Sequence, residues 1–336
     1  MEATQPTVPQ LNGPSAILPL ISAFADLSAG TEFASYKEPH WRFLLSGEDI
    51  TGYVVQSRED GSCFDGCVLK VNLENDNIGF GMVLVRPSKR GKGLARALLE
   101  KAMQTDAAEE NDMQAKNDKR GDKRFVLAVC SALGQPVYRK LGFKEVGMVT
   151  FLTCSIFHIL QTPRQRLLEN EHMSVTDGKN LQRDQLELLL KLDAEATDFK
   201  RRDRIKISLC GHAEGSHSTV AILATGESKN CISTAVARQD CIDGPLIIGP
   251  MRGKEKCAIP LVHALIDKHF EGKERNEINN ILVQIMITGH PNLVARMLEI
   301  NGMNRMWQSP AMSSDGKSVY LNGDGSYLAM MHPTLG

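Results

Sequence analysis

The sequence has little net charge and no basic residue near its start. Its 39 Lys and Arg residues nearly balance its 40 Asp and Glu residues, so the formal net charge is −1. Such a chain has no overall field that would attract nucleic acid or an anionic membrane, so any anion-binding site must be local. The first basic residue is Lys37, and the start therefore lacks the basic segment of a secretory signal peptide.

Long hydrophobic runs and a cysteine framework are also missing. The apolar stretch 16–27 is broken by Pro19 and interrupted by Asp26, so it predicts a helix packed on the protein body and no membrane span. Eight cysteines are scattered over 336 residues without the density of a small disulfide-bonded scaffold. We therefore expect a soluble, cytoplasmic protein with reduced thiols.

The length and the order of local patterns predict two domains. A chain of 336 residues exceeds one typical compact core. Helix and strand patterns alternate in the same order in both halves, which suggests an internal duplication. We expect an N-terminal arm and helix over 1–34, a first domain over 35–160, a linker over 161–172 and a second domain over 173–336.

Local periodicity predicts the elements of the first domain. Alternation over 41–57 indicates a strand and a loop, and residues 66–73 and 77–85 indicate two further strands. The stretch 105–124 carries 11 charged residues in 20 and has almost nothing to bury. It predicts a solvated insert between a helix and the next strand; a partner-binding segment is the alternative. In the second half, residues 205–210 predict a strand.

Residues 86–103, RPSKRGKGLARALLEKAM, join an expected strand to an amphipathic helix. Unpaired N–H groups at a helix start, together with the helix dipole, favour an anion. Gly91 and Gly93 allow the backbone to approach a ligand closely. Three basic residues lie at the mouth: Lys89, Arg90 and Lys92. The pattern predicts a pyrophosphate cradle; a surface turn that uses glycine only for its geometry is the alternative.

The two commonest pyrophosphate motifs are absent: G-x-x-x-x-G-K-[ST], and G-x-G-x-x-G followed by a ribose-binding acid. The pattern V-x-P-x-x-R-G-K-G-L-A instead resembles the acetyl-CoA-binding motif R/Q-x-x-G-x-G/A of the GNAT N-acetyltransferase superfamily. Arg90, Gly93 and Ala95 stand at its positions. About 45 residues later, VYRKLGF matches the second signature of the family, a helix bearing Tyr138. The resemblance covers residues 40–155.

This resemblance implies an α/β (α+β) fold with two GNAT-like domains, each a mixed, mostly antiparallel twisted sheet flanked by helices. It implies acetyl-CoA as co-substrate and no metal. The implied cofactor-binding residues are Met82, Val83, Leu84, Val85, Arg90, Gly91, Lys92, Gly93, Leu94 and Ala95.

The resemblance also implies direct acetyl transfer to an amine in a ternary complex. Tyr138 is the implied acid that protonates the CoA thiolate; a core tyrosine with its hydroxyl at the surface is the alternative. The family often has a Glu on the strand before the loop, but residues 77–85 contain no carboxylate. Glu74 and Asp76 suit solvated turn positions better, and ordered water or a side chain of the second domain is the other source of a base.

Several cysteines and histidines invite other chemistry. Cys130 follows a buried strand and is better explained as a small buried hydrophobe than as a nucleophile. Cys63 and Cys67 lack a second ligand pair for zinc. A polar loop accounts for His212 and His217 without a metal.

The second half resembles the C-terminal GNAT-type domain of the YitH/HolE-like group. The matching residues are Asp193, Phe199, Arg201, Arg238, Gly249 and Pro250. Counted from Arg252, however, the acetyl-CoA motif has Glu255 and Cys257 where it requires Gly and Gly or Ala. We expect this domain to be degenerate, to form part of the acceptor pocket and to stabilise the first domain.

The sequence thus predicts an acetyl-CoA-dependent N-acetyltransferase acting on a primary amine of a small molecule, without a nucleic-acid or membrane partner. A non-catalytic sensor or interaction module that binds CoA or acyl-CoA is the first alternative. A protein N-acetyltransferase is the second. The amine acceptor, the general base, the oligomeric state and the acyl-chain preference are left open by the sequence.

Overall fold

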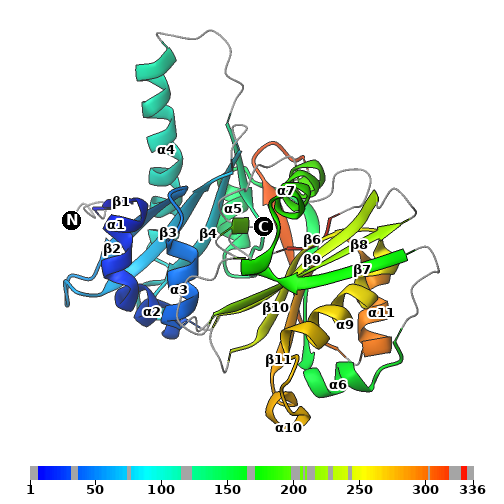
Figure 1. Cartoon of the computed structure of the whole chain (residues 1–336). Helices are drawn as coiled ribbons and strands as arrows, with labels where there is room; N and C mark the ends of the chain where they lie inside the picture. The colour runs from blue at the N-terminus through cyan, green and yellow to red at the C-terminus, as the bar shows by residue number, and fades with distance from the viewer. Residues whose placement is uncertain are drawn as a thin grey trace. The chain divides into compact units, whose positions relative to one another are not determined.

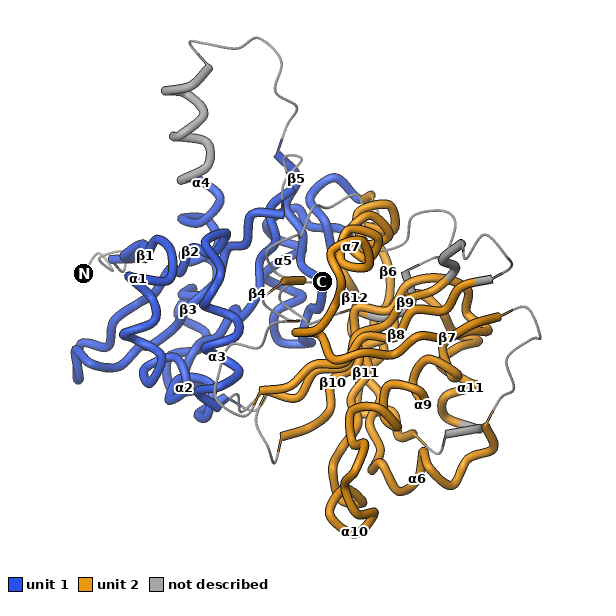
Figure 2. Tube along the Cα trace, viewed as in Figure 1, with its two compact units in different colours: residues 1–144, 312–316 blue, residues 145–311, 317–336 orange. Residues whose placement is uncertain are grey.

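The computed structural model of the chain forms two compact units (Figures 1 and 2). The first unit is Met1–Lys144 with Met312–Gly316, and the second is Glu145–Ala311 with Lys317–Gly336. The structure describes residues 7–31, 37–73, 77–114, 123–164, 171–197, 205–206, 209, 216–225, 230–240, 244–301, 303–317 and 327–330. In these ranges, every helix is too short or too polar to cross a membrane.

The first unit is a sheet with helices on its faces. Its strands are β1 (Gln10–Asn12), β2 (Ile50–Gln56), β3 (Phe64–Asn72), β4 (Asn77–Val85), β5 (Arg124–Leu127) and the end of β12 (Asn304–Ser313). Its helices are α1 (Gly13–Ile17), η1 (Leu18–Leu20), α2 (Ile21–Ala29), α3 (Glu38–Leu45), η2 (Pro87–Lys89), α4 (Leu94–Gln114) and α5 (Gln135–Lys140).

Strand pairing in the first unit places β4 between β3 and β5. Strands β1 to β4 pair antiparallel in chain order, whereas β4 and β5 run parallel. Strand β5 then pairs antiparallel with Met312 and Ser313 of β12. Helix α4 buries Leu98, Leu99 and Ala102 in a core that also contains Phe80 of β4.

The N-terminal part of the first unit contains more regular structure than the sequence indicates. The helix expected over 16–27 is confirmed, as α1, η1 and α2, and it buries Phe24 and Leu27. The strand expected from residue 41 is wrong at its start, because Trp41 lies in α3. The helix prevails there because Trp41, Leu44 and Leu45 share one buried face with helical spacing.

The second unit is a larger sheet. Its strands are β6 (Lys144–Ser155), β7 (Glu171–Asp177), β8 (His217–Thr225), β9 (Asn230–Gln239), β10 (Leu246–Gly253), β11 (Leu282–Thr288), most of β12, and β13 (Tyr327–Met330). Its helices are α6 (Ile156–Gln161), η3 (Gly178–Asn180), α7 (Arg183–Thr197), η4 (Glu255–Cys257), α9 (Ala258–His269), α10 (Arg275–Ile278) and α11 (Pro291–Asn301). The strand order is β12-β6-β11-β13-β10-β9-β8-β7, with an additional β10–β11 pairing.

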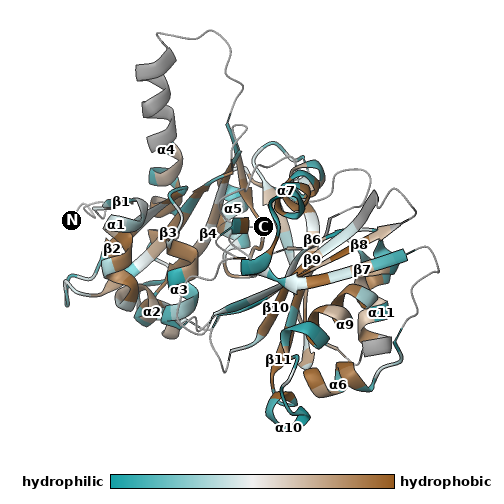
Figure 3. Ribbon diagram, viewed as in Figure 1, coloured by the Kyte–Doolittle hydropathy of each residue, from teal (hydrophilic) through white to brown (hydrophobic). Residues whose placement is uncertain are grey.

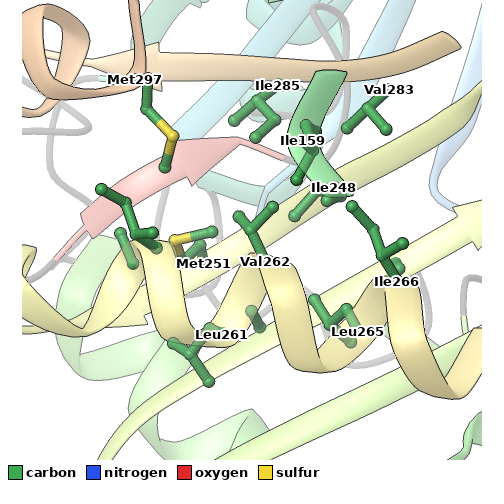
Figure 4. Close-up of a cluster of buried hydrophobic side chains, with 14 of the residues drawn as sticks. Ile159, Ile248, Met251, Leu261, Val262, Leu265, Ile266, Val283, Ile285 and Met297 are labelled. Carbon is green, nitrogen blue, oxygen red and sulfur yellow. The ribbon is translucent and has the colours of Figure 1, made fainter. Parts of the chain in front are cut away.

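The core of the second unit lies between the sheet and α9. Leu261, Val262 and Leu265 of α9 pack in one cluster with Ile248 of β10 and Ile285 of β11 (Figure 4). Helix α6 is coloured mainly hydrophobic in Figure 3 and contributes Ile156 and Ile159 to this core, whereas α10 is mainly hydrophilic.

Three sequence expectations differ from the observed elements. The domain end expected at residue 160 falls after β6, whose residues 149–155 pair with β11 in the second unit. The expected insert 105–124 begins as a continuation of α4 to Gln114. The strand expected over 205–210 is wrong at its start, where residues 205–206 are helical.

Some expectations fall on residues outside the described ranges. These are residues 115–122 of the insert, Glu74, Asp76, Phe199, Arg201 and His212.

Candidate functional site

The glycine-rich loop follows β4 and turns twice through left-handed backbone. Helix η2 leads into Arg90, and Gly91 and Gly93 then have φ angles of 75° and 78°. Side chains with a Cβ rarely adopt such angles, so glycine suits both positions. A Cβ built on either glycine would meet no atom within 4 Å. The loop therefore has open space in front of both glycines.

The loop ends at the start of α4, where backbone donors gather. The first helical bond that involves the loop runs from the Ala97 N–H to the Gly93 carbonyl, over 3.0 Å. The N–H groups of Leu94, Ala95 and Arg96 precede it and have no acceptor within the helix. The positive end of the helix dipole adds to their attraction for an anion. Open space, donors and dipole together fit a pyrophosphate.

The basic side chains of the loop have protein partners. Arg90 Nε donates to the Val85 carbonyl at 3.2 Å, and Lys92 Nζ donates to the Ser88 carbonyl at 3.3 Å. Both contacts stiffen the loop. Lys89 lies 2.8 Å from a carboxylate oxygen of Glu59 and 3.5 Å from one of Asp65, and its hydrogen bond to Glu59 raises the pKa of the Lys89 ammonium. These acids neutralise much of the charge that the sequence expected Lys89 to add.

Arg86 anchors the end of β4. Its Nε donates to the Phe64 carbonyl at 2.7 Å, and its guanidinium also pairs with Asp26 of α2. Its backbone N–H donates to the Asp65 carbonyl at 2.9 Å. These contacts hold the strand end from which the loop departs.

Strand β4 contains a bulge just before the loop. Cys67 pairs with Leu84 and Leu69 pairs with Gly81, so two residues of β4 face only Val68 of β3. Met82 lies in this bulge with a φ of 51°, the one positive value among the described non-glycine residues. A bulge redirects backbone groups away from the ladder, and such strained conformations concentrate at functional sites.

Strand β4 extends beyond the end of β5. Residues 77–80 of β4 pair with residues 124–127 of β5. Within the described part of the first unit, residues 81–85 have no strand on that side. This opening runs from the bulge toward the loop, so the expected contact residues 82–85 line it together.

Tyr138 lies in the core of the first unit. It belongs to the cluster that contains Phe80 and Leu98, and its ring meets Phe143 edge-on. Its hydroxyl lies over Gly134, where an added Cβ would stand 2.5 Å from Oη. Burial raises the pKa of Tyr138 far above its ordinary value. The phenol therefore keeps its proton throughout the ordinary pH range.

The other sequence candidates have local partners. The Cys130 thiol is buried and points to the Leu127 carbonyl at 3.9 Å. The Cys63 thiol donates to Asp60 at 3.2 Å, whereas Cys67 donates to Met82. His217 begins β8, so the interpretation of it as a loop residue is wrong; its ring lies 4.4 Å from that of His269.

The matching turn of the second unit lacks the cradle. It runs from β10 through η4 into α9, and Cys257 precedes the helix with right-handed backbone angles. Cys257 is buried, and Glu255 lies 3.8 Å from His290. Of the residues matched in this half, Asp193 pairs with Arg252, and Arg238 donates to Asp240 at 2.7 Å.

Sequence reasoning missed the contacts that Cys67, Arg86 and Gly134 make in this site. Nothing local marks Cys67, because its role depends on the strand opposite. Gly134 could have been noticed, since it stands four residues before Tyr138, one helical turn away.

A protein-family comparison finds a match within the first unit. Residues 48–145 match the family model of the acetyltransferase (GNAT) domain. No curated protein sequence matches the chain.

Solved structures share the fold of the whole chain at low identity. A candidate acetyltransferase from Pyrococcus horikoshii is 12% identical, with a TM-score of 0.63 over 100% of this chain and 98% of that one. A tandem GNAT protein from the clavulanic acid biosynthesis pathway is 12% identical, with a TM-score of 0.64 over 91% and 98%. A GCN5-related N-acetyltransferase from Sphaerobacter thermophilus is 13% identical, with a TM-score of 0.56 over 91% and 95%. Residues 48–145 thus match the acetyltransferase (GNAT) domain, within a chain that shares its fold with a tandem GNAT protein.

Proposed function

We propose that the protein is an N-acetyltransferase that uses acetyl-CoA to acetylate a primary amine of a small molecule. The observation that carries the proposal is the loop at the start of α4. Gly91 and Gly93 combine left-handed backbone with open space, and the first N–H groups of α4 follow directly in the chain. The bulge of β4 leads directly into this loop.

Different residues of the first unit bind different parts of acetyl-CoA in this proposal. The loop N–H groups bind the pyrophosphate, and the free edge of residues 82–85 holds the pantetheine arm. Acetyl-CoA supplies an activated acetyl thioester. Backbone N–H groups at the bulge polarise the thioester carbonyl, which is the usual role of donors placed in advance at a reacting oxygen.

Acid and base are separate groups in this proposal. A neutral amine forms the new N–C bond while the C–S bond breaks, so the amine loses one proton and the thiolate gains one. Tyr138 is the proposed acid that protonates the thiolate, and its phenolate must at once regain a proton from solvent, because burial strongly disfavours the charged form. Residues 77–85 offer no carboxylate, so ordered water or a side chain outside β4 takes the amine proton.

The nearly neutral chain supports a small acceptor. A formal charge of −1 gives no field that would recruit histones or nucleic acids. The acceptor class is best tested with a panel that contains polyamines, amino sugars, amino acids and a lysine-rich protein.

The test is release of free CoA thiol from acetyl-CoA with each acceptor, beside calorimetric titration with acetyl-CoA alone. Turnover with a small amine supports the proposal. Turnover restricted to the protein acceptor would make the chain a protein acetyltransferase. Saturable binding without any turnover would make it a sensor, and absence of binding would overturn the cofactor assignment.

A further inference from the structure

The second unit repeats the strand arrangement that opens the cofactor cleft in the first. Residues 246–248 of β10 pair in parallel with residues 283–285 of β11. Opposite β9, the register of β10 then shifts between Ile248 and Met251, where Gly249 and Pro250 both face Val236. Beyond this bulge β10 no longer pairs with β11. Strand β4 likewise pairs in parallel with β5 up to Phe80, where β5 ends, and then continues through its bulge without β5.

The two openings differ in what they contain. In the first unit, no described strand lies beside residues 81–85 on the side where β5 pairs with residues 77–80. In the second unit, strand β13 occupies the opening and runs antiparallel to both of its neighbours. Ala329 stands opposite Met251 of β10 and also opposite Ile287 of β11. Four residues of the chain thus fill the space between two diverging strands.

The pairing of β13 uses the backbone edges that an acyl-CoA arm would need. A pantetheine arm is an extended chain with two amide groups, and an extended peptide presents amides in a similar way. Each strand edge has one set of N–H and C=O groups. Because Met251 and Arg252 of β10 already pair with β13, they cannot also serve a pantetheine arm. Met330, the last residue of this segment, is fully buried and so is packed as well as paired.

The phosphate end of this second cleft has changed as well. Glu255 stands where the first loop has Gly93, and Cys257 stands where it has Ala95. The backbone before α9 is right-handed at Cys257. A carboxylate at this point repels a phosphate. Both ends of the cleft have therefore lost their fit to CoA.

We propose that the cleft of the second unit is a strand-binding groove whose occupant is the chain's own segment 327–330. The groove recognises extended peptide backbone by β-strand addition, and the chain binds a single acetyl-CoA, in the first unit. The proposal rests on the proposed function only where it assigns the first cleft to acetyl-CoA.

Hydrogen exchange on the unmodified protein tests both assignments separately. With saturating acetyl-CoA, we expect new protection at residues 82–97 and none at residues 249–258, with one acetyl-CoA per chain by calorimetry. Protection at both regions, or two molecules per chain, would overturn the groove assignment alone. If neither region gained protection, the proposed function would be contradicted. The groove assignment would then be tested by the peptide experiment alone.

The peptide experiment uses the full chain with Ala329→Pro. Proline cannot donate to the ladder, so β13 should leave the groove. Those amides among residues 251–252 of β10 and 286–287 of β11 that face β13 should then lose their exchange protection. A labelled peptide with the sequence of residues 325–332, GSYLAMMH, should then bind the variant saturably and restore that protection. The unmodified protein should bind the peptide at least about tenfold more weakly, a difference of about 1.4 kcal/mol.

Two results would overturn the groove assignment: unchanged exchange in the Ala329→Pro variant, and equal peptide binding by both proteins. If the Ala329→Pro variant does not fold, the groove assignment is still tested by the acetyl-CoA titration and the hydrogen-exchange pattern of the unmodified protein. A variant with Ala329→Ser keeps the backbone N–H at the same position, serves as the control and should resemble the unmodified protein.

Discussion

The thiol of Cys67 in β3 donates a hydrogen bond to the carbonyl oxygen of Met82 in β4, across 3.3 Å. Met82 has the left-handed conformation of the bulge, so the bond joins the strained residue to its neighbouring strand. Burial raises the pKa of the Cys67 thiol well above its ordinary value. The sulfur therefore keeps the proton that the bond requires.

Loss of this bond should affect catalysis more than cofactor affinity. We expect Cys67→Ala to lower kcat, because the bulge amides lose their orientation, while acetyl-CoA affinity changes little. Stability should fall by about 1–3 kcal/mol, the cost of an unsatisfied buried group, and Cys67→Ser should recover part of both effects. Cys154→Ala removes a similarly buried thiol in β6 and should leave kcat unchanged. Steady-state kinetics and thermal unfolding check this, and an unaltered kcat in Cys67→Ala would remove Cys67 from the mechanism.

Gly93 offers a test of the cradle with a matched control. Gly93 and Gly272 both have positive φ and no atom within 4 Å of an added Cβ. Valine at either position should therefore cost similar stability, about 1–2 kcal/mol for the left-handed backbone. Only Gly93→Val should weaken acetyl-CoA binding, by at least about tenfold, or about 1.4 kcal/mol. Calorimetry compares the two variants, and equal affinities would show that the loop does not bind the cofactor.

The role of Tyr138 is tested against Tyr53, another buried tyrosine of the same core cluster. Tyr138→Phe should lower kcat by roughly 10²- to 10⁴-fold, the usual contribution of a positioned acid, with little change in cofactor affinity. The Tyr53 hydroxyl is buried without a hydrogen-bond partner, so Tyr53→Phe should leave kcat intact and cost no stability. Single-turnover rates of the two variants are compared. Equal rates would remove Tyr138 from its role as the acid.

His269 should make the second unit sensitive to acid. Burial lowers the pKa of His269 to about 3, and the positive charges of His217 and Lys273 act in the same direction. Its stabilising contribution is therefore complete above the unfolded pKa of about 6.5 and is lost as the pH falls from there toward 3. The loss at pH 5 should be about 2 kcal/mol.

Replacing His269 should flatten this acid response. Thermal unfolding between pH 7.5 and 4.5 should show a smaller decrease for His269→Gln than for the unmodified protein. His172→Gln alters an exposed histidine of β7 and should keep the original decrease. An equal decrease in all three proteins would contradict the prediction.

Sequence reasoning predicted those parts of the fold that depend on local pattern. The glycines of the loop, the face of α4 and the helix that carries Tyr138 are all marked by neighbours within one or two turns. The bulge at Met82 is not marked, because a methionine with positive φ has no local signature. Strand β13 is missed for a similar reason, since its four residues become a strand only between β10 and β11.

The position of β12 in the chain affects how the first unit folds during synthesis. Met312 and Ser313 complete the sheet of the first unit by pairing with β5, and Met312 is buried in its core. During translation, the glycine-rich loop is synthesised early. Residues 312 and 313, which add the last strand to that sheet, are synthesised much later. The first unit therefore finishes folding only after residue 313 has been synthesised, and a nascent chain stalled within residues 145–311 would carry the glycine-rich loop on an incomplete sheet.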